Sequence, residues 1–276
     1  MNDRPIGVFD SGLGGLTVLQ ALADLLPDEH LIYLGDTARY PYGPRSREEL
    51  QRFSAEIADL LLAQGVKMIV IACNSATAAA LELLRETTDV PVIGVVEPGV
   101  RAAQRVTSTG HVGVIGTQIT ADSKIYEHTA EHLRTGLELT TLACPGFVEL
   151  VEDGETTGPR ADEVIGTRLV ELADHDIDVL VLGCTHYPLL ARTIKDHVGR
   201  GVTLVSSADE TAFEVRDILE RTGWMREPAG IPGTRTFFTT GDPARFRELG
   251  ERFLGFPLTD VRAHHWPASP APAADL

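Results

Sequence analysis

The chain has 276 residues, 43% of them hydrophobic and 23% charged, which is typical of a globular protein with a sizeable core and room for two modest domains. The net charge of −16 argues against non-specific binding to nucleic acid or anionic membranes, and no run of 18 apolar residues indicates a membrane span. The polar first residues leave no room for a signal peptide, and three cysteines without paired spacing favour reduced thiols and a cytoplasmic protein.

Segments typical of strands and of helices alternate along the chain. Short apolar runs bounded by glycine or polar residues predict buried strands at 6–9, 31–34, 68–72, 92–95, 112–115, 137–142, 179–182 and 202–205. Helical patterns are predicted at 16–26, 47–63, 76–86, 121–133, 159–173 and 189–197. This alternation predicts an α/β fold whose parallel sheets are joined by right-handed crossover connections.

A long connection follows the second predicted strand. Residues 35–46 are rich in glycine, proline and tyrosine, and the segment ends at Ser46, which forms a capping-box pattern with Glu49. The segment is either a cover over a binding site or a simple connector. A second loop, 144–152, follows the strand predicted at 137–142 and leads into a short helix that carries carboxylates.

Two pairs of similar segments indicate an internal duplication. The segment around Gly7 resembles the segment around Gly113, at an offset of 106 residues, and the run that ends in Cys73 resembles the run that ends in Cys184, at an offset of 111 residues. Matches at nearly the same offset predict a duplicated α/β unit with small insertions. The predicted fold is therefore α/β, with two pseudo-symmetric parallel-sheet domains and the active site between them.

The repeats also predict the domain boundaries. Breaks near 97–99 and near 206–208 separate the second repeat from the rest of the chain. The helical pattern at 209–221 and the strand-like segment at 236–240 are expected to return and complete the first unit. We therefore predict a first domain of residues 1–97 plus 208–265, a second domain of residues 98–207, and a disordered tail at 266–276 that is rich in proline and alanine.

The two repeated cysteines are the strongest candidates for catalysis. Open α/β sheets place their chemistry at the carboxyl ends of strands, so both thiols should lie in one site lined by four strand ends. A thiol is a base only as its thiolate, and inversion at a single carbon needs two opposed acid/base groups. His186 is the candidate partner of Cys184, Asp10 that of Cys73, and Glu152 a further acid or base near the second cysteine. The alternative is that the cysteines pack as small buried hydrophobes.

Three cofactor-dependent alternatives are weaker. The run Gly12-Leu13-Gly14-Gly15 followed by Asp36 is similar to a dinucleotide fingerprint, but Thr17 stands at its third glycine position and Asp10 would face the pyrophosphate. The candidate zinc ligands, three cysteines and His186, lack Cys-x-x-Cys spacing. None of the three lysines lies in a loop with the phosphate-binding glycines expected of a pyridoxal enzyme. We therefore expect no cofactor and no metal.

Specific motifs run through most of the chain. They are Gly7-Val8-Phe9-Asp10-Ser11-Gly12-Leu13-Gly14-Gly15, Gly35-Asp36-Thr37 with Pro41-Tyr42-Gly43-Pro44, Ala72-Cys73-Asn74-Ser75-Ala76, Gly113-Val114-Ile115-Gly116-Thr117, Cys144-Pro145 with Phe147-Val148 and Val151-Glu152, and Leu182-Gly183-Cys184-Thr185-His186-Tyr187-Pro188-Leu189-Leu190. In these motifs the chain resembles the glutamate racemases of the cofactor-independent Asp/Glu racemase family.

The resemblance implies roles for particular residues. Cys73 and Cys184 match the two cysteines that the family uses as opposed bases. The auxiliary acid/base residues fall on Asp10, His186 and Glu152. The substrate contacts fall on Asp10, Ser11, Tyr42, Gly43, Asn74, Ser75, Thr117, Thr185 and His186.

The chain departs from the family pattern at three positions, none of which removes a catalytic group. Ser75 stands where threonine is more usual, and the exchange keeps the hydroxyl. Glu149 stands where proline is common. Ile119 stands where a glycine often precedes the next residue, which leaves the role of Thr120 as a substrate contact open.

The resemblance also implies a function, namely interconversion of L- and D-glutamate by proton transfer at Cα without a cofactor. The product D-glutamate would serve peptidoglycan synthesis and so cell shape, and a homodimer is expected. Two alternatives stay open, a racemase for aspartate or a hydantoin and a regulatory binding protein that acts on DNA gyrase. The sequence carries no motif for a gyrase contact.

Overall fold

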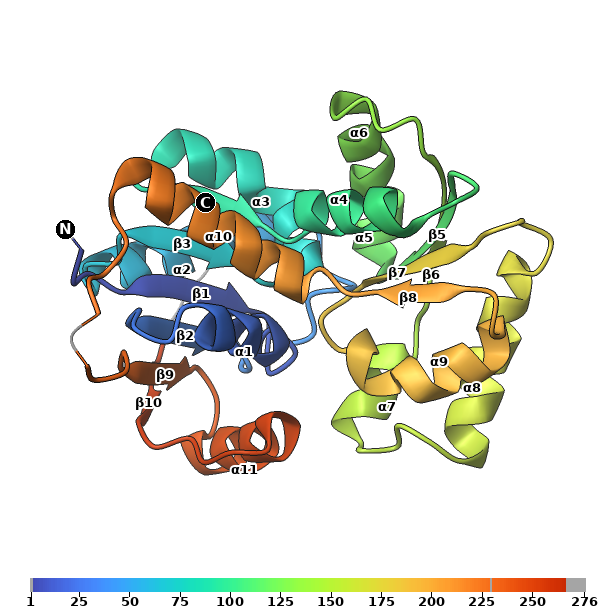
Figure 1. Ribbon diagram of the computed structural model, residues 1–276. Coiled ribbons are helices and arrows are strands. Elements are labelled where there is room, and N and C mark those ends of the chain that lie inside the picture. Colours follow the sequence, from blue (N-terminus) through green and yellow to red (C-terminus); the bar gives the residue numbers. More distant parts are fainter. Residues whose placement is uncertain (1, 229, 267–276) are drawn as a thin grey trace, which may run out of the picture.

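The computed structural model describes residues 2–228 and 230–266, which form two parallel β-sheets set side by side (Figure 1). The larger sheet has the strand order β10-β9-β2-β1-β3-β4, and the smaller sheet has the order β6-β5-β7-β8. The strands are β1 (Ile6–Asp10), β2 (Leu31–Gly35), β3 (Met68–Ile71), β4 (Val92–Gly94), β5 (His111–Gly116), β6 (Glu138–Ala143), β7 (Val179–Gly183), β8 (Thr203–Val205), β9 (Arg235–Thr239) and β10 (Val261–Ala263). The α/β class and all eight predicted strands are confirmed.

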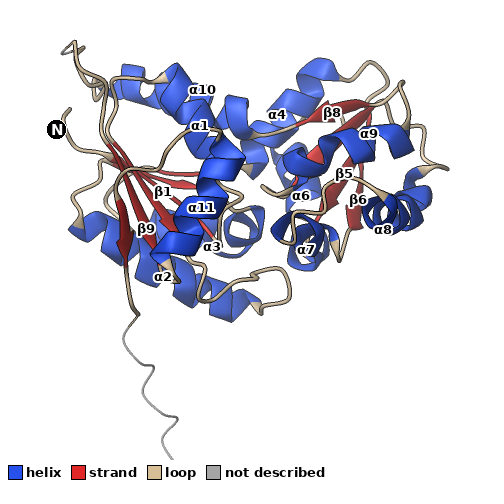
Figure 2. Ribbon diagram, turned by 90° about the horizontal axis from the view of Figure 1, so that it is seen from below, coloured by secondary structure: helices blue, strands red, loops and turns tan. Residues whose placement is uncertain are grey.

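Helices cover both faces of each sheet (Figure 2). On the larger sheet, α1 (Leu16–Leu25), α10 (Ala208–Thr222) and α11 (Pro243–Leu254) pack on one face, and α2 (Arg47–Ala63) and α3 (Asn74–Thr87) pack on the other. On the smaller sheet, α4 (Val96–Val106) and α6 (Ile125–His132) lie opposite α7 (Phe147–Glu152), α8 (Pro159–Leu169) and α9 (Ala191–Val198). Shorter helical segments are α5 (Gln118–Asp122), η1 (Val170–Leu172) and η2 (Tyr187–Leu190).

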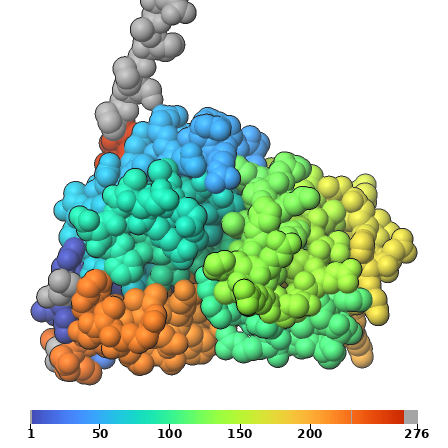
Figure 3. Space-filling view, turned by 90° about the horizontal axis from the view of Figure 1, so that it is seen from above, coloured from blue at the N-terminus to red at the C-terminus, as the bar shows by residue number. Residues whose placement is uncertain are grey.

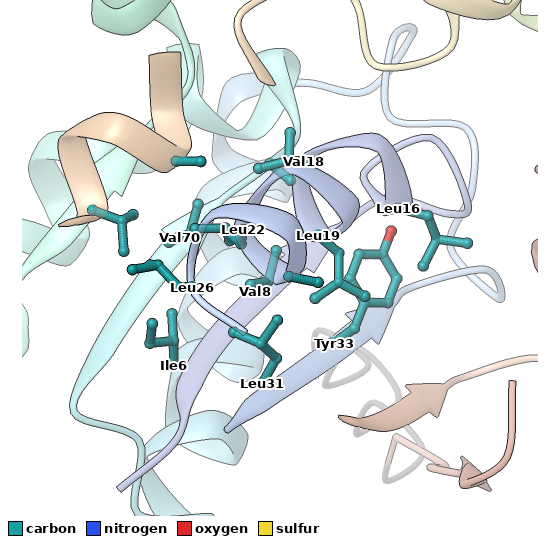
Figure 4. Close-up of a cluster of buried hydrophobic side chains, with 14 of the residues drawn as sticks. Ile6, Val8, Leu16, Val18, Leu19, Leu22, Leu26, Leu31, Tyr33 and Val70 are labelled. Carbon is teal, nitrogen blue, oxygen red and sulfur yellow. The ribbon is translucent and has the colours of Figure 1, made fainter. Parts of the chain in front are cut away.

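Strand β1 shows why the apolar runs predict the strands so well. Ile6 and Val8 pack under α1 with Leu19 and Tyr33 (Figure 4), whereas Phe9 belongs to the cluster on the opposite face. Successive side chains of a strand point to opposite faces, and both faces of this sheet are covered by helices. The run is therefore continuously apolar rather than alternating.

The two sheets share the strand order that an internal duplication predicts. β2-β1-β3-β4 in the larger sheet corresponds to β6-β5-β7-β8 in the smaller one. Gly7 pairs with Ile69, and Gly113 pairs with Leu180. Gly113 lies 106 residues after Gly7, and Leu180 lies 111 residues after Ile69, so the two strand pairs correspond at the two repeat offsets. The duplicated parallel-sheet unit is therefore a property of the structure as well as of the sequence.

The chain returns to the larger sheet after the smaller one is complete. β9 pairs with β2, and β10 pairs with β9, as expected for the segment at 236–240. Trp266 donates its indole N–H to Asp36, so the predicted disordered tail is wrong for residue 266, whose aromatic ring is held by packing. Residues 267–276 of that tail lie outside the described residues. The domain boundaries themselves stay a prediction.

The structure differs from the predicted elements at several helices. Helix α4 runs through the break expected near 97–99, because Pro98 lies in the first turn of the helix, where its missing N–H costs nothing. The helix predicted at 121–133 is split into α5 and α6 by Lys124, which has a left-handed backbone with φ of 50°. Helix α11 and strand β10 were not predicted at all.

A buried ion pair joins the start of the chain to its late segments. The Lys67 ammonium lies 2.6 Å from the Glu29 carboxylate and donates to the carbonyls of Asn2 at 3.0 Å and Trp224 at 2.8 Å. We expect Lys67→Met to lower the free energy of unfolding by roughly 3–5 kcal/mol, because it leaves a buried carboxylate without its cation. Chemical denaturation measures the loss, and adding Glu29→Gln should recover part of it. A Lys67→Met protein as stable as the wild type would contradict this expectation.

Candidate active site

The carboxyl ends of strands from both sheets meet at one cavity of about 170 Å³. In the space-filling view, the blue-to-teal surface of the first half meets the green surface of the second half along a seam (Figure 3). The first half lines the cavity with Ser11, Tyr40, Pro41, Tyr42, Gly43, Pro44, Cys73, Asn74 and Ser75. The second half lines it with Thr117, Gln118, Cys144, Pro145, Gly146, Val148, Glu149, Cys184, Thr185 and His186.

Most of the predicted site residues therefore lie on one cavity. Asp10 and Glu152 do not line it, and each reaches it through another residue. Asp10 is fully buried behind the cavity. Glu152 lies on a neighbouring cavity of about 320 Å³, which shares Tyr40 with the first.

Cys73 lies where β3 ends and α3 begins. Its Sγ accepts a hydrogen bond from the backbone N–H of Ala76 at 3.5 Å, so the thiol caps the first turn of the helix. Burial raises the pKa of this thiol strongly, and the charge of Asp10 raises it further. These two effects hold the side chain as the neutral thiol, the form that can donate a proton.

Cys184 stands at the corresponding end of β7 and begins a chain of polar contacts. Its Sγ lies 3.8 Å from Nδ1 of His186, whose Nε2 lies 2.9 Å from a carboxylate oxygen of Glu152. Burial alone would lower the pKa of His186, but its hydrogen bonds to Cys184 and Glu152 outweigh burial and raise that pKa to about 10. The imidazole is therefore protonated at neutral pH, and its positive charge stabilises negative charge on the neighbouring sulfur.

Asp10 was predicted to be the partner of Cys73, but its hydrogen bonds go to other groups. One carboxylate oxygen accepts from the backbone N–H of Gly12 at 3.0 Å, and the other accepts from the Thr185 hydroxyl at 3.3 Å. The second bond crosses to the half that carries Cys184. Asp10 thus acts on Cys73 through its charge, while its hydrogen bonds join the two halves.

Hydroxyl and amide groups form the polar wall of the cavity. The Thr117 hydroxyl lies 2.9 Å from that of Ser75 and 3.1 Å from that of Thr120. Thr120 is fully buried and does not line the cavity, so its hydroxyl supports Thr117 instead. The Tyr126 hydroxyl donates to the side-chain oxygen of Asn74 at 2.8 Å, and the amide nitrogen of Asn74 has no hydrogen-bond partner among the described residues and can donate to a ligand.

Several residues on the cavity were not predicted as site residues. Tyr40 lies with its ring centre 6.1 Å from that of His186, and burial raises the pKa of its hydroxyl. Gln118, Glu149 and the segment 144–146 complete the wall on the second half. The tyrosine-rich segment 35–46 and the Cys144-Pro145 motif are visible in the sequence. Only the packing of the two halves shows that they face the cavity.

The glycine-rich turn after β1 packs against the second half. A Cβ on Gly14 would lie 2.4 Å from Oγ1 of Thr185 and 2.7 Å from Nδ1 of His186. Thr185 and His186 therefore occupy the space beside the turn. In a dinucleotide fingerprint, the pyrophosphate would need that space to approach the backbone.

We expect Gly14→Ala to reduce kcat by about 100-fold in the direction in which Cys184 is the base, because the new methyl group displaces His186 from the Cys184 sulfur. Steady-state kinetics with a measurement of Tm separates this effect from unfolding. Gly201→Ala is the matched control, since a Cβ there meets open space. Full activity of the Gly14→Ala variant would show that the turn does not hold these groups in place.

Two further searches cover the described part of the chain. No helix in residues 2–228 and 230–266 is long and apolar enough to cross a membrane. Within the same residues, no group of three or more histidine, cysteine, aspartate and glutamate side chains is arranged to hold a metal ion.

Two α/β halves that each supply a cysteine to a shared cavity define an enzyme that acts on a small substrate between them, and comparisons with known proteins agree. Residues 6–215 match the Asp/Glu/Hydantoin racemase family. The glutamate racemase of Parafrankia sp. (strain EAN1pec) is 50% identical over 261 residues, which cover 95% of this chain and 94% of that protein. The glutamate racemase isoform RacE1 from Bacillus anthracis has a similar structure, with a TM-score of 0.91 and 42% identity over 98% of this chain and 100% of that one. The chain therefore belongs to the Asp/Glu/Hydantoin racemase family and is an isomerase.

A third match has a ligand named in its description. The glutamate racemase of Francisella tularensis, solved in complex with D-glutamate, has a TM-score of 0.89 and 34% identity, covering 96% of this chain and 98% of that one.

Proposed function

We propose that this protein interconverts L- and D-glutamate, with Cys73 and Cys184 as the two opposed acid/base groups. The observation that carries the proposal is that both sulfurs line one cavity from corresponding strand ends of the two halves. A base on one face of Cα and an acid on the other is what inversion at a single carbon requires.

The cavity supports a small anionic amino acid as the substrate. Its volume of about 170 Å³ lies below the roughly 300–1,000 Å³ of sites for drug-sized ligands. Among residues 2–228 and 230–266, no lysine or arginine side chain lines it, so backbone N–H groups, hydroxyls and the Asn74 amide would hold the carboxylates. The choice of glutamate rests on the relatives that are named glutamate racemases and on the D-glutamate complex of the Francisella protein.

The two cysteines take opposite roles in the two directions. In one direction, the Cys184 thiolate beside the His186 imidazolium removes the α-proton, and the neutral Cys73 thiol delivers its proton to the opposite face. In the other direction the two cysteines exchange roles. The negative charge that develops at Cα spreads into the substrate carboxylate, where preorganised donors such as Thr117 and Thr185 stabilise it.

The remaining parts of the function stay predictions. Supply of D-glutamate for peptidoglycan, a homodimer and contact with DNA gyrase follow from the family resemblance, and a cytoplasmic location rests on the three cysteines without paired spacing. A racemase for aspartate or a hydantoin is the second candidate, because the matching family covers those substrates. Measuring the change in optical rotation with each compound separately distinguishes them.

The decisive experiment is hydrogen exchange at Cα in deuterated water. Purified protein, dialysed extensively against a chelator, is incubated with L-glutamate and separately with D-glutamate, with no cofactor added. We expect both enantiomers to gain deuterium at Cα and to converge on a racemic mixture. A lack of exchange with glutamate, together with exchange when aspartate or a hydantoin is supplied instead, would overturn the choice of substrate. Activity that appears only after zinc or pyridoxal phosphate is restored would overturn the proposed chemistry.

A further inference from the structure

Residues 36–44 are here called the substrate-covering loop, because Tyr40 to Pro44 line the cavity, and the loop begins with the buried carboxylate of Asp36. One oxygen of Asp36 accepts from the Arg39 guanidinium at 2.6 Å and from the Tyr42 hydroxyl at 2.5 Å. The other oxygen accepts from the Thr240 hydroxyl and from the Trp266 indole N–H, each at 2.9 Å. A buried carboxylate is costly unless it is paired and hydrogen-bonded. The loop conformation in which Asp36 accepts from all four donors is therefore the stable one.

Trp266 contributes its ring as well as its N–H. The Arg39 guanidinium carbon lies 4.1 Å from the centre of the Trp266 ring and 4.1 Å from the centre of the Phe53 ring. A guanidinium over two aromatic rings is stabilised by cation–π attraction, which favours the position in which Arg39 contacts Asp36. Trp266 thus helps to hold Asp36 and Arg39 in place, although it lies 230 positions from Asp36 in the sequence.

The anchored loop reaches the site directly. Tyr42 and Gly43 line the catalytic cavity. Gly43 packs so closely on the second half that a Cβ there would lie 3.2 Å from Cβ of Thr117. The position of Asp36 therefore affects where Tyr42 and Gly43 stand in the cavity wall.

We propose that Trp266 is a positioning residue for substrate binding, acting through Asp36 and Arg39 on the substrate-covering loop. The proposal rests on the proposed function, since it assigns the loop to amino-acid binding. Trp266 does not line the cavity and touches neither cysteine, so it acts on the binding of the amino acid rather than on proton transfer.

The kinetic test uses two substitutions in the full chain. Trp266→Phe keeps an aromatic face over Arg39 and removes only the N–H, and we expect it to raise KM for both enantiomers by about 3- to 10-fold. Trp266→Ala removes both contributions, and we expect a rise of about 10- to 100-fold. In each variant kcat should change by less than about 3-fold, because the Cys184–His186 contact is untouched. Trp224→Phe, at the only other tryptophan, is the matched control.

A second measurement tests the stability of the loop in the absence of substrate. Amide hydrogen exchange should become faster in residues 36–46 of Trp266→Ala, while exchange in β1 and β3 stays as in the wild type. Because it needs no turnover, this readout separates a failure of the present proposal from a failure of the proposed function. Wild-type protein that does not racemise glutamate overturns only the latter.

Three results would overturn the proposal. They are unchanged loop exchange in Trp266→Ala, a loss in kcat that exceeds the rise in KM, and faster exchange throughout the larger sheet. The last result would mean that Trp266 merely stabilises the fold. If Trp266→Ala does not fold, Trp266→Phe decides by the same criteria.

Discussion

Replacing either Cys73 or Cys184 by alanine is expected to abolish racemisation, with kcat falling by about 10⁴-fold or more in both directions. Each turnover needs one sulfur to remove the α-proton and the other to deliver a proton to the opposite face. Neither sulfur can reach both faces, since the two enter the cavity from different halves. Polarimetry with each enantiomer, at matched protein stability, measures the loss.

The third cysteine gives a matched control for these variants. Cys144 also lies on the cavity wall, but its thiol is directed at the backbone carbonyl of Leu142 at 3.8 Å, and burial raises its pKa to about 12. Cys144→Ala should therefore keep most of the activity. Near-wild-type racemisation by Cys73→Ala or Cys184→Ala would contradict the two-base mechanism.

The single variants should keep half of the chemistry. With a β-chloro amino acid as the substrate, the remaining thiolate can remove the α-proton while chloride leaves from the β-carbon, so no second acid is needed. We expect each variant to eliminate chloride from only one enantiomer. Elimination from both enantiomers by one variant would contradict the assignment of one face to each sulfur.

Replacing His186 or Asp10 by asparagine is expected to reduce kcat unequally for L- and D-glutamate, by roughly 10²- to 10⁴-fold in the more affected direction. The His186 imidazolium stabilises charge on Cys184, so His186→Asn should slow most the direction in which Cys184 is the base. The Asp10 charge raises the pKa of Cys73 and so favours its proton-donating form. Asp10→Asn should therefore also slow most the direction in which Cys73 delivers the proton and Cys184 is the base.

Thermodynamics supplies an internal check on these two variants. Free L- and D-glutamate have equal free energies, so the ratio of the two kcat/KM values must stay at one in every variant. An unequal loss of kcat must therefore be matched by an unequal change in KM. Equal losses of kcat in both directions for both variants would mean that His186 and Asp10 bind substrate rather than adjust individual thiols.

Patterns that depend on burial were predictable from the sequence. The eight apolar runs became β1 to β8, because a strand covered on both faces must be apolar along its whole length. The repeat offsets also matched the strand register, because a duplicated unit keeps its internal pairing. Helix α4 was missed because a proline and a glycine usually break helices, and only the position of Pro98 in the first turn removes the conflict.

The sequence by itself determined that two cysteines, with their neighbours, end equivalent strands, because strand ends and repeats are local patterns in the chain. Only the tertiary structure decided which groups touch. The Asp10 carboxylate accepts hydrogen bonds from Gly12 and Thr185 rather than from the Cys73 thiol, and Glu152 contacts the cavity wall through His186. Trp266 looked like the start of a disordered tail, yet it completes the anchor of the substrate-covering loop. Hydrogen bonds and ring contacts between residues far apart in the chain depend on how the halves pack, and no local pattern encodes that packing.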